Sequence, residues 1–88
     1  NKNAANIRKH GVSFEEAESV FPDDAALLLD DPEHSENESR FLLLGMSRAL
    51  RILVVCHCYR ETDDIIRIVS ARKATKTETR QYNQRRRP

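Results

Sequence analysis

Three apolar runs lie close together in the second half of the chain, and they limit the folds it can adopt. The runs are RFLLLGMS (40–47), LRILVVCHCYR (50–60) and IIRIVS (65–70), each separated from the next by only a few residues. Parallel strands need a crossover of a dozen or more residues, whereas antiparallel strands can be joined by a tight turn. The spacing therefore predicts an antiparallel sheet. A further short strand is predicted from AALLL (25–29), before an acidic loop, which makes three to four strands.

Two short helices are predicted before the sheet. The first covers NKNAANIRKHG and ends at Gly11, a residue type that readily adopts the left-handed conformation of a helix C-cap. The second covers VSFEEAESVFP, where Ser13 and Glu16 have the spacing of a capping box, in which each side chain bonds the other residue's backbone N–H. Val12 and Ala17 are placed around this box as a hydrophobic staple.

A second capping box, formed by Thr75 and Glu78, predicts a helix that opens near residue 75 and continues to about Asn83. The predicted fold class is therefore α+β: two short N-terminal helices, an antiparallel sheet and a C-terminal helix. Eighty-eight residues provide a single domain with a small core. We assign this domain to residues 1–84 and regard residues 85–88 as a basic tail.

Charge is distributed unevenly along the chain. Residues 1–71 contain 8 Lys/Arg against 13 Asp/Glu, and residues 72–88 contain 7 against 1, although the formal net charge is only +1. Such an uneven distribution indicates that the basic end binds a polyanion, or that the acidic part binds a basic partner. No apolar run reaches the roughly 18 residues of a membrane-spanning helix, and no glycine-rich nucleotide loop is present.

Cys56, His57 and Cys58 lie in the central predicted strand. Two cysteines at this spacing in an extended chain cannot readily form a disulfide with each other, and reduced cysteines are typical of a cytoplasmic protein. A structural zinc site needs four ligands, and His10 and His34 are too isolated to complete one. We therefore expect no metal and no cofactor.

Three cations near the end of the sheet are candidates for a phosphate site. Regular alternation along the last strand places Arg67 and Ser70 on opposite faces. An arginine within an apolar strand needs a partner, and the sequence leaves open a structural ion pair, for example with Asp64, or a functional role. Arg72 and Lys73 lie between the predicted strand and the helix cap, where cations can surround a bound phosphate or simply be solvated.

His57, Tyr59 and Glu61 supply three possible proton-transfer groups within five residues. His57 and Tyr59 share one face of the strand. Spacing alone favours the interpretation that they are half-buried sheet residues, and it does not assign them a role.

Three segments together resemble a known family. NIRKHGVSFEEA, DPEHSENESRF and IRIVSARKATKTETRQY are similar, in this order, to the BrnT toxins of type II toxin–antitoxin systems, over roughly residues 1–83. The resemblance implies a compact RelE-like fold and a cytoplasmic, metal-independent endoribonuclease that arrests growth by cutting RNA. It also implies a BrnA-type antitoxin, a hetero-oligomer with that antitoxin, and operator DNA bound only through the complex.

The implied chemistry is attack of the RNA 2′-OH on the adjacent phosphorus, which requires proton transfer and cations that stabilise the transition state. The predicted catalytic residues are Arg67, Arg72, Lys73, Glu61, His57 and Tyr59, and the predicted RNA-binding residues are Lys9, His10, Arg60 and Lys76. The alternative is a non-catalytic RNA-binding or antitoxin-paired module in which the same cations only bind. Members of the family usually begin with a short strand ahead of the first helix, so we expect that strand to be missing here, which could expose a sheet edge.

Overall fold

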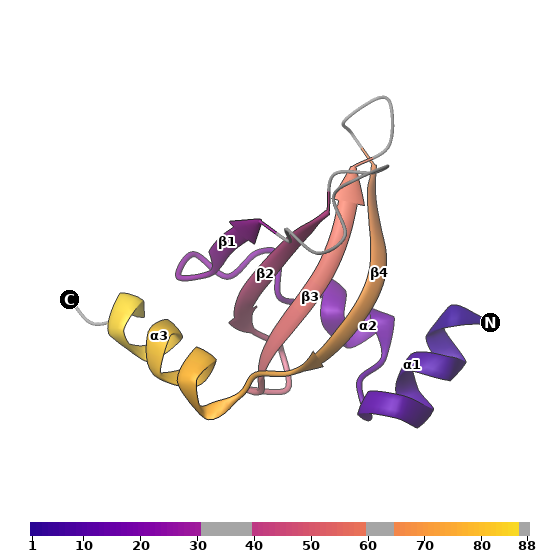
Figure 1. Ribbon diagram of the computed structural model, residues 1–88, viewed down its shortest axis with the longest axis horizontal. Coiled ribbons are helices and arrows are strands. Elements are labelled where there is room, and N and C mark those ends of the chain that lie inside the picture. Colours follow the sequence, from indigo (N-terminus) through magenta and orange to yellow (C-terminus); the bar gives the residue numbers. More distant parts are fainter. Residues whose placement is uncertain (31–39, 60–64, 87–88) are drawn as a thin grey trace.

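The computed structural model describes residues 1–30, 40–59 and 65–86 (Figure 1). Its elements are α1 (Lys2–His10), α2 (Phe14–Glu18), β1 (Leu27–Asp30), β2 (Phe41–Met46), β3 (Ile52–Tyr59), β4 (Ile66–Lys73) and α3 (Lys76–Arg86). The strands form one antiparallel sheet in the order β1-β2-β3-β4, so neighbours in the chain are neighbours in the sheet. The predicted α+β class, helices and antiparallel sheet are confirmed.

Helices cover both faces of the sheet, because successive residues of β3 point to opposite sides and most of them are apolar. One core cluster joins α2 and the residues on either side of it to the sheet: Val12, Ala17, Val20, Leu43, Leu53, Val55 and Ala71. The other joins α3 to the opposite face: Leu44, Val54 and Tyr82. Figure 1 shows the same arrangement, with α1 and α2 on one side of the strands and α3 on the other.

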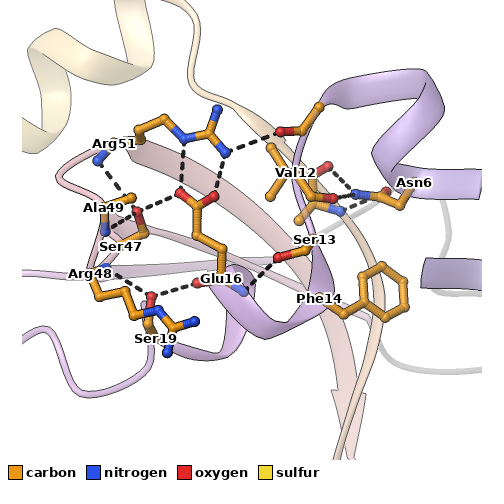
Figure 2. Close-up of polar contacts among 12 residues, drawn as sticks. Asn6, Val12, Ser13, Phe14, Glu16, Ser19, Ser47, Arg48, Ala49 and Arg51 are labelled. Atoms are coloured by element: carbon orange, nitrogen blue, oxygen red, sulfur yellow. Dashed lines mark hydrogen bonds and ion pairs between the residues drawn. The ribbon is translucent and has the colours of Figure 1, made fainter. Parts of the chain in front are cut away.

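The predicted capping box at the start of α2 is only half formed. Ser13 Oγ accepts the backbone N–H of Glu16 at 3.0 Å, as expected, but the Glu16 carboxylate does not return to Ser13. It accepts instead from Arg51, with Nε at 2.9 Å, and from Ser47 Oγ at 2.7 Å (Figure 2). Charge-assisted bonds to a guanidinium are stronger than a bond to a neutral backbone N–H. The Arg51 bonds also lower the pKa of Glu16, and the pair ties α2 to the β2–β3 turn.

The capping box at the start of α3 forms completely. Thr75 Oγ1 accepts the N–H of Glu78 at 3.1 Å, and Glu78 Oε1 accepts the N–H of Thr75 at 2.9 Å. The helix then continues to Arg86, beyond the predicted end at about Asn83. Arg85 and Arg86, which the sequence analysis placed in a basic tail, are therefore helical.

A β-bulge changes which side chains of β4 share a face. The pairs on either side of it are Cys56 with Ser70, His57 with Ile68, and Cys58 with Arg67. Val69 is therefore an extra residue without a direct partner, and the strand changes sides at this point. The prediction of regular alternation was wrong, because Arg67 and Ser70 lie on the same face.

β4 is longer than predicted. It continues to Lys73, so Arg72 and Lys73 belong to the strand, and the prediction that they lie in a strand-to-helix junction was wrong. Arg72 pairs with Val54 and Lys73 pairs with Leu53. Because these β3 residues are adjacent, Arg72 and Lys73 point to opposite faces of the sheet.

Candidate functional site

Arg67 and Arg72 lie on the same face of the sheet, the face that α3 partly covers. Their partners in β3 are Cys58 and Val54, which are four residues apart and so point to the same side, roughly 13 Å from each other along the strand. In a regular strand, residues 67 and 72 would point to opposite sides. The bulge at Val69 is therefore what brings these two guanidinium groups to one face.

The Arg67 side chain is half-buried and forms no hydrogen bond or ion pair with any other residue in 1–30, 40–59 or 65–86. Asp64, the acid considered from the sequence, lies outside the described residues. A cation that is partly withdrawn from water gains from contact with an anion. The Arg67 guanidinium is thus partly buried and available to pair with an external anionic group.

Arg72 forms a two-pronged ion pair with Glu78 at the start of α3. Its two terminal nitrogens donate to the two carboxylate oxygens at 2.8 and 3.0 Å. These hydrogen bonds lower the pKa of Glu78 to about 2 and raise the pKa of Arg72. Glu78 is therefore a carboxylate at neutral pH and a weak proton acceptor. The Arg72 side chain is still 40% exposed, so it remains accessible to solvent beside the helix.

The Arg72–Glu78 ion pair predicts how the free energy of unfolding depends on pH. Because the folded-state pKa of Glu78, about 2, lies below the ordinary value of 4.5, the carboxylate stabilises the fold above about pH 4.5. That stabilisation is lost as the pH falls towards 2. We expect Glu78→Gln to lower the free energy of unfolding at pH 7 by about 1–2 kcal/mol, since partial solvent exposure screens the pair.

Urea unfolding between pH 7 and pH 2 measures this effect. The Glu78→Gln variant should show a flatter pH dependence of the free energy of unfolding below pH 4.5 than the unmodified chain. Glu18→Gln, at an exposed carboxylate of α2, is the matched control and should keep the original dependence. The same pH dependence in all three proteins would contradict a stabilising role for this pair.

His57 lies in the core of the opposite face. It is fully buried, and its ring contacts Phe21 at 4.9 Å, Tyr59 at 5.5 Å and Phe41 at 6.0 Å between centroids. Burial lowers the pKa of His57, which favours the neutral imidazole. Its Nε2 is buried without a hydrogen-bond partner. The structure therefore places this residue away from Arg67 and Arg72 and away from solvent.

The remaining predicted residues are distributed over both sides of the sheet. Tyr59 is 40% exposed at the end of β3 and shares the face of His57. Lys73 is exposed and points to the side of α1, whose last residues are the exposed Lys9 and the half-buried His10. Lys76 is exposed at the first position of α3. Arg60 and Glu61 lie outside the described residues.

Sequence reasoning missed two residues of α3. Glu78 was identified as a cap but not as the partner of Arg72, because the turn between β4 and α3 brings them together and no periodic pattern indicates it. Arg80 is exposed one helical turn after Lys76, and its i,i+4 spacing from Lys76 could have identified it.

Two further properties concern only the described part of the chain. Within it, no group of three or more His, Cys, Asp or Glu side chains is placed to hold a metal ion, and no helix combines the length and apolar character needed to span a bilayer. Cys56 and Cys58 are buried and are not joined in a disulfide, in agreement with the prediction that they do not bridge each other.

Two guanidinium groups thus lie on one sheet face of a small α+β domain, beside a basic C-terminal helix, and guanidinium donors match phosphate oxygens. The family comparison is more specific. Residues 1–78 match the family described as "Ribonuclease toxin, BrnT, of type II toxin-antitoxin system". The chain belongs to this family, and the resemblance predicted from its sequence is confirmed. A search of curated proteins found no match to the chain.

Proposed function

We propose that this chain is a cytoplasmic toxin that cleaves RNA as a metal-independent endoribonuclease and so arrests growth. Its membership of the BrnT family of ribonuclease toxins is the observation that carries this proposal. A type II toxin is paired with an antitoxin. We propose that a BrnA-type antitoxin neutralises this chain by binding it in a hetero-oligomer. In the proposed system, operator DNA is bound through the antitoxin.

In the proposed reaction, the RNA 2′-oxygen attacks the adjacent phosphorus and the bond from phosphorus to the 5′-oxygen breaks. A base takes the 2′-OH proton and an acid protonates the leaving 5′-oxygen, so the products are a 2′,3′-cyclic phosphate and a 5′-OH. Negative charge builds on the non-bridging oxygens in the transition state. Arg67 and Arg72 are proposed to stabilise it, because a guanidinium presents paired donors that match phosphate oxygens.

Proton transfer is proposed for Tyr59 and Glu61. Tyr59 is exposed, whereas buried His57 is better suited to support the Tyr59 ring through their edge-on contact. Lys9, His10, Arg60, Lys73 and Lys76 are proposed to contact RNA outside the reacting phosphate.

A cleavage assay tests the proposal. Purified chain free of antitoxin, incubated with single-stranded RNA in EDTA, should produce fragments that end in a 2′,3′-cyclic phosphate. A substrate with 2′-deoxy nucleotides should not be cut, because it lacks the nucleophile. If cleavage requires added divalent metal, the proposed metal independence is contradicted but the nuclease activity is not. Absence of cleavage with and without metal would contradict the nuclease itself.

A non-catalytic RNA-binding or antitoxin-paired module is the second candidate. The engagement of Arg72 by Glu78 and the burial of His57 favour it, since both leave fewer groups free for chemistry. Such a module would bind the RNA in the same assay without cutting it, and its induction in cells would not arrest growth.

A further inference from the structure

One flank of α3 carries a stripe of exposed or half-exposed polar side chains that the proposed catalytic site does not use. Its members are Lys76, Thr79, Arg80, Asn83 and Gln84, and they line an open hollow of about 480 Å³. Their spacings of three and four residues place them side by side on the helix. Hereafter we refer to these five residues as the α3 stripe.

The two positive charges of the α3 stripe, on Lys76 and Arg80, destabilise the helix on which they lie. Lys76 is in the first turn, where the helix dipole disfavours a cation. Lys76 and Arg80 are four residues apart, and like charges at this spacing repel each other. The acid of α3, Glu78, is occupied by Arg72 and by the N–H of Thr75. An anion bound along the stripe would remove both unfavourable interactions.

The composition of the α3 stripe indicates which anion fits. The centres of protein–protein interfaces are rich in aromatic and other apolar groups, and the stripe contains none. Contacts to a nucleic-acid backbone are made by Lys and Arg together with Ser, Thr, Asn and Gln, and these types account for every member of the stripe. Lys76 and Arg80 are separated by about 6 Å along the helix axis, which lets them contact different phosphates.

We propose that the α3 stripe is a docking site for the sugar–phosphate backbone of the RNA substrate, outside the reacting phosphate. Lys76 and Arg80 contact two phosphates, and Thr79, Asn83 and Gln84 donate hydrogen bonds to the same strand. The identity of the polyanion rests on the proposed ribonuclease function. The stripe binds the strand without reading its bases, because phosphate contacts carry no sequence information.

Binding to 2′-O-methyl RNA tests this inference independently of cleavage, because that RNA lacks the nucleophile. The double variant Lys76→Ala/Arg80→Ala should reduce the steepness of log K against log salt by about 1.4, the value for two lost single-strand phosphate contacts. The matched control is Arg85→Ala/Arg86→Ala, which removes the same charge from the same helix outside the hollow and should leave the slope unchanged. Circular dichroism and thermal unfolding establish that both variants are folded.

Three results would overturn the inference: an unchanged slope for the Lys76/Arg80 variant, an equal change in both double variants, or a loss of antitoxin affinity in the Lys76/Arg80 variant with unchanged RNA binding. The last would assign the stripe to the protein partner. A failure of the nuclease proposal gives a different result. In that case no RNA is cut, but the slope of log K against log salt is still less steep for Lys76→Ala/Arg80→Ala than for Arg85→Ala/Arg86→Ala.

Discussion

Replacing Arg67 with alanine is expected to lower kcat/KM for RNA cleavage by about 100-fold or more, the usual cost of removing one donor that stabilises transition-state charge. The free energy of unfolding should change by less than about 0.5 kcal/mol. The reason is that the side chain of Arg67 makes no hydrogen bond or ion pair with the rest of the described chain. Cleavage kinetics and urea unfolding of the same preparation measure the two quantities.

Two further variants make this result specific. Arg67→Lys keeps the charge but loses the planar fork, so it should recover only part of the activity. Arg8→Ala removes the same charge from an exposed position of α1 and should cleave RNA like the unmodified chain. Full activity of Arg67→Ala, or a loss of stability above about 2 kcal/mol, would show that Arg67 has a structural role instead.

Asn6→Ala is expected to lower the free energy of unfolding by about 3 kcal/mol. Asn6 is a buried residue of α1 (Figure 2), and its amide donates to the carbonyls of Val12 at 2.8 Å and Ala71 at 2.9 Å. Its side-chain oxygen accepts the N–H of Ala71 at 3.1 Å. The amide thus bonds the edge of β4 as a neighbouring strand would. Its removal leaves three backbone groups without these bonds.

Asn3→Ala is the matched control for this variant. Asn3 is an exposed residue of the same helix and accepts one bond, from the N–H of Phe14 at 2.9 Å. We expect it to cost about 1 kcal/mol or less, because solvent can replace the lost partner. If urea unfolding gives equal losses for the two variants, Asn6 is not the link between α1 and the sheet edge that the contacts indicate.

The sequence predicted the parts of this protein that depend on neighbouring residues. The apolar runs predicted the strands, their short links predicted antiparallel pairing, and Thr75 with Glu78 predicted the start of α3. These patterns are informative because strand links and helix caps involve residues only a few positions apart. Arg67 and Arg72 could be selected as phosphate-binding candidates from their residue type, although the position predicted for Arg72 and the face predicted for Arg67 were wrong.

Tertiary structure decided the contacts that join distant parts of the chain. Pairing with β3 introduces the bulge at Val69, and this brings Arg67 and Arg72 to one face of the sheet. Glu16 bonds Arg51 in place of the backbone of Ser13, and Asn6 bonds the edge of β4. The physical reason is the same throughout. A polar side chain binds the strongest partner within reach, and strand register depends on the whole pair, so neither can be read from one segment alone.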